Sequence, residues 1–245
     1  MLALLLIALL WAAPSWAQTV TFDAVTVNDN ADADTTTNFN HTVGAGSNVY
    51  VGACVATRGG SSISVSSFNI GGGAATFLQA ADTTSEGGGI IRVELWGRAM
   101  GSTTGAIAVN PTVSASDRFR TTAFSLFGVD QTTPVGTIPA GVTGSSTSLT
   151  QNVSSATGGL VAACVAVGTS GTSALTAGAG QTSRQLNNTD LNNTYEDLTT
   201  EPGAGTVTMS ESWTGGNYSG LVTAPWNAAA AGGSCQSRSL LGVGC

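Results

Sequence analysis

The sequence contains no lysine, a single histidine and few charged residues of either sign. All seven cations are arginines, and Asp, Glu, Lys and Arg together make up 9% of the 245 residues. Without lysine, the chain cannot form a Schiff base or the lysine contact of a phosphate-binding P-loop. The formal net charge is −7 and the arginines form no basic run, so the sequence argues against a nucleic-acid partner.

Residues suited to catalysis are also scarce. The histidine, His41, has no nucleophile motif such as GxSxG to serve, and we interpret it as a surface residue at the edge of a strand. Glycoside hydrolysis needs two flanking carboxylates. The acidic residues that offer such pairs are Glu86, Glu94, Glu196, Asp197, Glu201 and Glu211. Any chain with this many acids offers such pairs by chance, so the pairs are weak evidence for catalysis. We expect no enzymatic activity and no cofactor.

Neither the cysteines nor the acidic residues predict a metal site. No two cysteines have the CxxC spacing of a zinc or redox site. Asp29, Asp32 and Asp34, in the run NDNADAD, offer the oxygen ligands that calcium prefers. The run lacks the glycine and the terminal glutamate of an EF-hand loop, so the sequence favours a solvated turn there.

Four cysteines are compatible with an oxidising compartment. Cys54 and Cys164 lie in apolar, strand-like segments, whereas Cys235 and Cys245 lie in a Gly/Ser-rich tail. Of the three connectivities that two disulfides allow, we favour Cys54–Cys164 with Cys235–Cys245. The alternative is that Cys54 and Cys164 are buried as small apolar residues. The sequence leaves both open.

The first residues resemble an export signal. Met1–Ala17 is an apolar run that ends in small residues and fits a signal peptide cleaved before Gln18. The alternative is an uncleaved apolar arm. We expect one β-sandwich domain over residues 18–229, without a bilayer span, and a flexible C-terminal tail over residues 230–245. The predicted location is extracellular, at a cell surface or on a virion.

The remaining sequence alternates strand and turn signals at the spacing of a β-sandwich, without a useful helical period. Asn48–Thr57 is almost continuously apolar, which predicts a strand at the centre of a sheet. GSNVYVGACVATRGGSS is echoed by GGLVAACVAVGTSGTS, as in a jelly roll whose two halves each contribute a central strand. We therefore predict an all-β, two-sheet antiparallel β-sandwich, jelly-roll-like and forming a single domain.

The stretch FSLFGVDQTTPVG, Phe124–Gly136, resembles the "sGVDqttPv" signature of Gly/Ser/Thr-rich jelly-roll-like domains. Such domains recur in secreted bacterial surface proteins and in phage particle proteins. The resemblance extends over Val20–Ala229 through SNVYVGACVAT, IIRVELWGRAM, GGLVAACVAV and SESWTGGNYSGLVTAPW. It implies no catalytic residues. From its own chemistry, Asp130 is expected to bond backbone amides in a turn, and Pro134 to end strand pairing.

Aromatic residues cluster late in the chain, at Trp213, Tyr218 and Trp226. If exposed, they form a platform for glycans; if buried, they belong to the core, which strand alternation favours for Trp226. We predict a structural or adhesive component of an extracellular surface or virus particle, such as a phage decoration or tail-associated protein or a surface-fibre subunit. Its expected partners are further copies or other surface subunits. The alternative is a secreted carbohydrate-binding or adhesion module.

Overall fold

The computed structural model describes residues 18–30, 34–83, 89–168, 174–191, 194–215 and 218–230, without the side chains of 188–191. All regular structure in these residues is β-strand, and every strand pairing is antiparallel. The same residues contain no helix long and apolar enough to cross a membrane. The predicted all-β class is confirmed.

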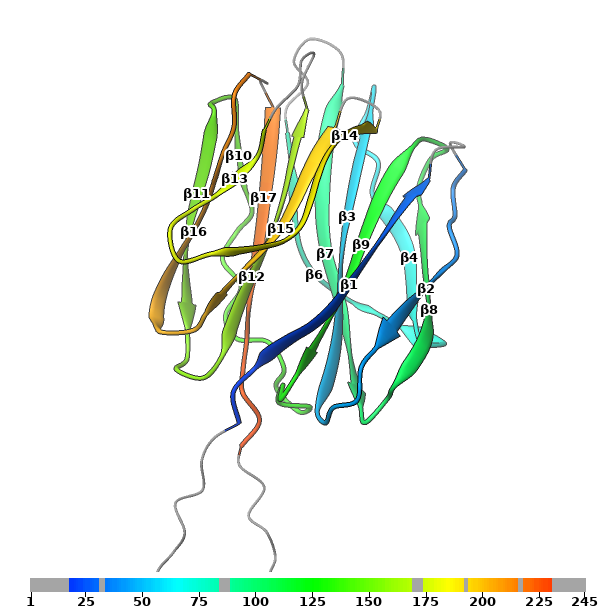
Figure 1. Ribbon diagram of the computed structural model, residues 1–245. Coiled ribbons are helices and arrows are strands. Elements are labelled where there is room, and N and C mark those ends of the chain that lie inside the picture. The colour runs from blue at the N-terminus through cyan, green and yellow to red at the C-terminus, as the bar shows by residue number, and fades with distance from the viewer. Residues whose placement is uncertain are drawn as a thin grey trace, which may run out of the picture.

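The first half of the chain forms two sheets (Figure 1). The five-stranded N-inner sheet has the order β1 (Thr21–Asn30), β9 (Phe119–Phe127), β3 (Val49–Gly59), β7 (Ile90–Gly101) and β6 (Thr76–Asp82). The four-stranded N-outer sheet has the order β2 (Phe39–Val43), β8 (Gly105–Val113), β4 (Val65–Ile70) and β5 (Gly73–Ala74).

The second half forms two more sheets. The five-stranded C-inner sheet has the order β10 (Val142–Gly144), β17 (Tyr218–Trp226), β12 (Leu160–Gly168), β15 (Thr194–Pro202) and β14 (Thr182–Leu191). The three-stranded C-outer sheet has the order β11 (Ser148–Ser155), β16 (Gly205–Ser212) and β13 (Thr176–Ala177).

The four sheets lie in layers (Figure 1). Three apolar cores separate them. The N-terminal core, between the N-outer and N-inner sheets, includes Val51, Val55, Phe68 and Val109. The central core, between the two inner sheets, includes Tyr50, Leu95, Phe124, Leu198 and Trp226. The C-terminal core, between the C-inner and C-outer sheets, includes Leu149, Val161, Val165 and Met209.

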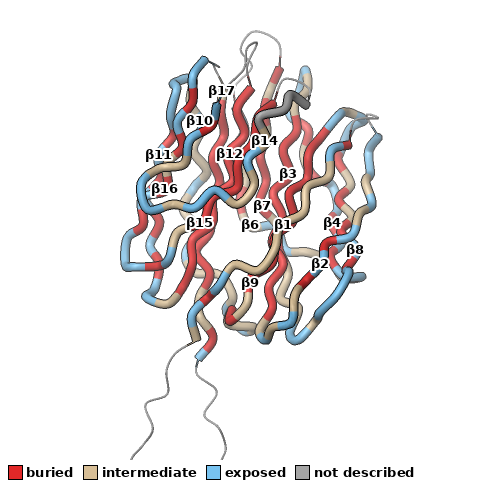
Figure 2. The backbone as a smooth tube through the Cα atoms, viewed as in Figure 1, coloured by how far each residue is buried: buried red, intermediate tan, exposed pale blue. Residues whose placement is uncertain are grey.

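The layering explains why β3 and β12 are apolar at almost every position. A strand with one face in solvent alternates apolar and polar residues, whereas a strand covered on both faces does not. β12 is buried along its whole length, and β3 along all but its last two residues (Figure 2). The prediction that Asn48–Thr57 lies at a sheet centre is confirmed.

The two halves repeat one strand order. Without β5, the strands from β1 to β9 correspond one to one, in sequence order, to the strands from β10 to β17. Under this correspondence the two inner sheets have the same strand order, and so do the two outer sheets. Asn48 and Gly158, at the same offset from Cys54 and Cys164, both have positive φ, 54° and 83°. Each half is thus an antiparallel β-sandwich of its own.

The predicted β-sandwich architecture is therefore present twice. We expected one sandwich of two sheets, in which the two echoing segments share the central positions. Instead, each segment is the middle strand of its own inner sheet, and the two inner sheets pack on each other. The physical reason is that a strand apolar on both faces needs a layer on each side, which a two-sheet sandwich does not supply.

Candidate functional site at the junction of the two sandwiches

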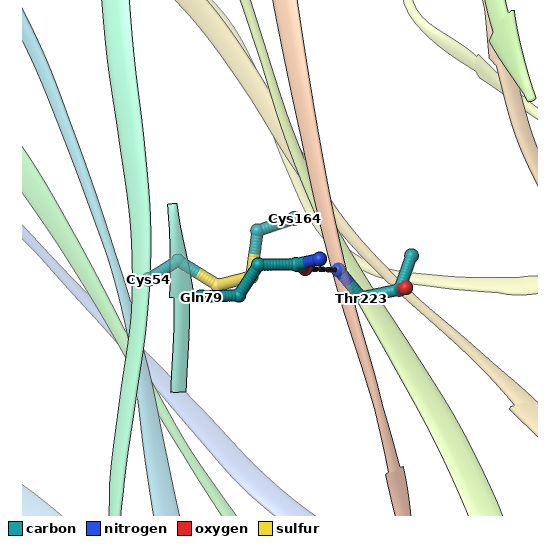
Figure 3. The surroundings of a disulfide bond; sticks show 4 residues. All are labelled: Cys54, Gln79, Cys164 and Thr223. Carbon is teal, nitrogen blue, oxygen red and sulfur yellow. Dashed lines mark hydrogen bonds between the residues drawn. A yellow bond between two sulfur atoms is a disulfide. The ribbon is translucent and has the colours of Figure 1, made fainter. Parts of the chain in front are cut away.

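A disulfide between Cys54 and Cys164 joins the two inner sheets (Figure 3). The Cα atoms are 6.1 Å apart, within the usual range for a disulfide, and both cysteines are buried. Their positions are equivalent, because Cys54 pairs in register with Leu95 of β7 and Cys164 pairs with Leu198 of β15. This is one of the two expected pairs. Cys235 and Cys245 lie outside the described residues.

A buried glutamine reinforces the same junction. Gln79 of β6 accepts a hydrogen bond from the backbone amide of Thr223 in β17 (2.5 Å; Figure 3). Its amide group also donates to the Pro139 carbonyl. The Thr223 hydroxyl donates to Oε1 of Gln151 in β11 (2.7 Å). Hydrogen bonds therefore run from the N-inner sheet to the C-outer sheet. These bonds could not be predicted from the sequence, because a buried glutamine in a strand has no distinguishing pattern.

The segment between β9 and β10 carries the chain from one sandwich to the other. Gly128 has φ 72°, and a Cβ atom there would lie 2.6 Å from the Thr19 carbonyl oxygen, so a side chain would be strained on two counts. Oδ1 of Asp130 accepts hydrogen bonds from the amides of Thr133 (3.0 Å) and Thr132 (2.7 Å). These two amides hold the pKa of Asp130 below its ordinary value. The predicted Asp130 turn is confirmed.

The prediction that Pro134 ends strand pairing is wrong. Its carbonyl accepts a hydrogen bond from the amide of Asn227 (2.9 Å), and Val135 forms a β-bridge with Trp226. Proline removes only the donor of its own residue, and its carbonyl remains able to accept. The segment therefore continues along the end of β17 and binds the second sandwich there.

Gln131 binds the first sandwich at the same place. Its Oε1 accepts from the amide of Gly101 (2.8 Å), and its Nε2 donates to the carbonyls of Val129 (2.9 Å) and Val49 (3.2 Å). The run Gly128–Gly136 thus contacts the first sandwich through the Gln131 side chain and the second through backbone atoms of Asp130 and Pro134. Its side chains have structural roles that account for the residue types present.

A groove of about 440 Å³ lies where this run passes β6 and β7. Its lining combines apolar residues such as Leu78 and Val135 with hydroxyl and cationic ones such as Thr132 and Arg98. The volume is within the range of small-molecule sites. The sequence did not predict this concavity, because its walls come from four separate stretches of chain.

We expect Gln131→Ala to lower the free energy of unfolding by about 1–2 kcal/mol, because three backbone groups lose their side-chain partner. Thr132→Ala is the matched control at the exposed neighbouring position and should change stability by less than about 0.5 kcal/mol. Urea unfolding of both variants measures the difference. Equal effects would show that the Gln131 amide does not hold the junction.

The predicted glycan platform requires correction. Trp226 is fully buried and packs edge-to-face on Phe124 (5.6 Å between ring centroids) and Tyr50 (5.9 Å). Trp213 is 5% exposed in the C-terminal core, and Tyr218 is half-buried against the central core. A ring must present a face to solvent to stack on a sugar. The two tryptophans therefore belong to the cores, as strand alternation favoured for Trp226.

The interpretation of His41 as a surface residue is also wrong. His41, on β2, is fully buried against β1 and β9 of the facing sheet, with Nδ1 2.9 Å from the Thr26 hydroxyl and Nε2 3.0 Å from that of Ser125. The Ser125 hydroxyl is 2.6 Å from Oδ2 of Asp23, a carboxylate that can only accept. Ser125 therefore donates to Asp23, and Nε2 of His41 donates to Ser125.

This order of bonds differs from that of a Ser-His-Asp triad, in which the serine proton goes to the histidine and the aspartate orients the imidazole. Here Ser125 lies between His41 and Asp23. Burial lowers the pKa of His41, and the charge of Asp23 only partly opposes this. The neutral imidazole serves to join the N-outer sheet to the N-inner sheet. The sequence contains no signal for these contacts.

Glu94 and Glu201, two of the candidate carboxylates, have different surroundings. Glu94 accepts from Arg92 Nε (2.5 Å), the Val65 amide (3.1 Å) and Trp96 Nε1 (2.7 Å). Glu201 is half-buried near the end of β15, and burial raises its pKa. Glu86 lies outside the described residues.

Glu196 lies at the boundary between the sandwiches, with Oε1 3.9 Å from Nη1 of the buried Arg120. The guanidinium also binds Asp29, through Nε (2.5 Å) and Nη2 (3.3 Å). Burial raises the pKa of Glu196 to about 8, although Arg120 acts in the opposite direction. Asp29 is therefore an ion-pair partner. Asp32 lies outside the described residues, and no group of three metal ligands occurs among those described, Asp34 included.

Asp197 and Glu211 are the one carboxyl pair among the described candidates that the fold brings into contact. Asp197 faces the C-terminal core from β15, and Glu211 faces it from β16. They are 3% and 2% exposed. Burial raises the pKa of both, and the charge of Asp197 raises that of Glu211 further. This placement leaves no room for a substrate between them, so it does not support glycoside hydrolysis.

Comparison with known proteins adds no relative: no family model, no curated protein and no solved structure matches this chain. The resemblance of Phe124–Gly136 to the jelly-roll-like surface and phage domains therefore stays a prediction.

Proposed function

We propose that this protein is a non-enzymatic structural or adhesive component of an extracellular surface or virus particle, which associates with further copies or with other surface subunits. The observation that carries the proposal is the Cys54–Cys164 disulfide between two sandwiches of one strand order. Buried disulfides of this kind persist in oxidising compartments and are rare in the cytosol. A subunit whose two sandwiches are linked by a central disulfide is suited to a load-bearing or particle-bound role.

The chemistry-bearing side chains support the same proposal. His41 is buried in a chain of hydrogen bonds, Glu94 is bound by three donors and Arg120 is committed to two carboxylates. Each group joins two sheets or two strands. Their roles are those of a protein selected for rigidity rather than for turnover.

The two outer faces of the stack are free of charged side chains over their strands. The exposed residues of the C-outer sheet are Ser148, Thr150, Asn152, Ser154, Thr176, Thr206, Thr208 and Ser212, with Gly205 at the turn. Those of the N-outer sheet are Asn40, Thr42, Ser66, Ser67, Asn69, Ala74, Gly105, Ala106 and Ala108. A face without charges packs against another subunit without the cost of desolvating ions.

We expect the native protein to form a discrete oligomer in light scattering. Thr150→Arg in the C-outer face and Ala108→Arg in the N-outer face each place a charge at an exposed strand position, and at least one of them should dissociate the oligomer. Thr157→Arg, in the exposed turn before β12, is the matched control and should leave it intact. A monomer at every concentration would contradict the self-association proposal.

A carbohydrate-binding or adhesion module is the second candidate, and one observation favours it. Phe77 of β6 is 47% exposed and packs edge-to-face on the half-buried Trp96, with 5.2 Å between ring centroids. An exposed ring held by a second ring is suited to stack on a sugar. Glycan-array binding by a monomer, lost in Phe77→Ala, would favour this candidate over the first.

A further inference from the structure

Asp197 and Glu211 meet across the C-terminal core, one from each sheet that encloses it. Asp197 lies between Val165 of β12 and Leu186 of β14 in register, and Glu211 lies between Leu149 of β11 and Ala177 of β13. Both acids therefore occupy interior strands with apolar pairs on each side, and both are almost fully buried.

No cation neutralises the pair in the part of the second half that the structure describes. The one cationic residue there is Arg184 of β14, which donates to the Thr200 hydroxyl (2.7 Å) and lies 4.4 Å over the ring of Phe22 in the first half. It points away from the C-terminal core. Ser183 donates to Oδ1 of Asp197 (2.8 Å), and it is a neutral group.

The other titratable groups on the surrounding strands do not compensate either. β15 adds Tyr195 on the same face, Glu196 toward Arg120 and Glu201 at its far end. β14 also carries Asp190, whose side chain is not described. β10, β11, β12 and β13 carry no charged residue, and β17 adds only Tyr218, which packs on the central core.

In the first sandwich, the acid equivalent to Asp197 has a cationic partner. Glu94 pairs with Val55 of β3 as Asp197 pairs with Val165 of β12, so the two acids are equivalent in the repeated strand order. Glu94 accepts hydrogen bonds from Arg92 and from the Trp96 indole, whereas Asp197 contacts a second acid, Glu211. The repeat therefore contains a charge-compensated acid in one half and a pair of acids in the other.

We propose that Asp197 and Glu211 share one proton, and that the C-outer sheet stays closed on the C-inner sheet only while this proton is retained. Two carboxylates in contact without a cation cannot both ionise at low cost. The pair thus makes the second sandwich alkali-labile, whereas no such pair occurs among the described residues of the first. This device goes beyond the proposed structural function and does not depend on it.

The sign follows from proton linkage. Burial and mutual repulsion raise the pKa values in the folded state, so the folded protein holds more protons than the unfolded chain between the ordinary carboxyl range and the folded values. Stability contributed by the pair is therefore full in acid and is lost as pH rises. Above the folded-state pKa values, the unfolding equilibrium constant should be larger by about tenfold for each unit by which the folded-state pKa exceeds the unfolded-state pKa.

The test compares hydrogen exchange and thermal midpoint at pH 5 and pH 9.5 for the full chain, its Glu211→Gln variant and the Glu201→Gln control. Exchange rates are corrected for their intrinsic pH dependence. We expect alkali to expose the amides of β11 and β16 in the unmodified protein while those of β2 and β8 stay protected. Glu211→Gln should remove the difference, because its amide donates to the Asp197 carboxylate without a titrating proton.

Glu201→Gln also removes one glutamate charge, from β15, the strand of Asp197, without touching the pair, and it should keep the alkaline opening. If Glu211→Gln does not fold, Asp197→Asn tests the same bond from the other side. Equal pH dependence in the unmodified protein and in a folded pair variant would overturn the proposal. So would opening of both sandwiches together, since only the second holds the pair. All variants keep the same cysteines, so thiol exchange at high pH affects them alike.

Discussion

Replacing both Cys54 and Cys164 by alanine should lower the free energy of unfolding by about 3–5 kcal/mol, since the bridge closes a long loop of the unfolded chain. The cysteines are 110 residues apart, and their disulfide lies in the central core between the two inner sheets. Its loss removes a constraint on the unfolded chain and leaves the two sandwiches joined by packing, by hydrogen bonds such as Gln79–Thr223 and by the run Gly128–Gly136. Denaturant unfolding under non-reducing conditions measures the change.

A reductant supplies the matched control for this experiment. The unmodified protein should lose stability when the disulfide is reduced under conditions that allow access, and the double alanine variant should not respond. Peptide mapping without reduction should recover Cys54 and Cys164 in one linked fragment. If the unmodified protein unfolds at the same denaturant concentration with and without reductant, the bridge does not stabilise the stack.

Trp226→Ala should lower the free energy of unfolding by about 3–5 kcal/mol, as expected for truncating a large aromatic side chain in a core. Trp226 belongs to the second sandwich, yet its neighbours Tyr50 and Phe124 belong to the first. The fully buried indole fills the central core between the inner sheets. Its removal therefore weakens the contact between the halves as well as the packing of β17.

Leu186→Ala is the matched control for Trp226→Ala, because Leu186 is 40% exposed on the edge strand β14. It should change stability by no more than about 0.5 kcal/mol. Chemical unfolding and glycan binding are measured on both variants. Unchanged stability with lost glycan binding in Trp226→Ala would contradict the buried position and restore the predicted aromatic platform.

The central core is thus the feature on which both predictions depend. It is formed by the inward faces of two sheets whose other faces are covered by the outer sheets. The disulfide, the Gln79–Thr223 bond and Trp226 all cross it. We expect a block joined in this way to behave as one unit under load, as the proposed role at a surface or on a particle requires.

Strand class was readable from the chain because it depends on local patterns. Alternation along β11 and β16, and the continuous apolar runs of β3 and β12, follow from which faces of each strand are buried. The Asp130 turn was readable for the same reason, since its bonds reach only two and three residues ahead. The pairing of Cys54 with Cys164 was one of two open alternatives.

The number of layers could not be predicted from the sequence, although the two apolar strands that require the additional layers were recognised. Two echoing apolar strands fit equally well as two strands of one sandwich or as the middle strands of two. Periodicity reports whether a face is buried but not what buries it. The choice depended on pairing between distant strands, such as Cys54 with Thr122 and Cys164 with Val222.

The sequence by itself determined the β class, the central strands and the residue types that exclude lysine chemistry, because these depend on composition and short-range pattern. Tertiary structure decided that His41 is buried, that Trp226 belongs to the core and that Asp197 meets Glu211. Each of these depends on contacts between strands far apart in the chain, whose register no local pattern fixes. The burial of a polar or aromatic side chain is a property of its neighbours, and the fold alone brings those neighbours together.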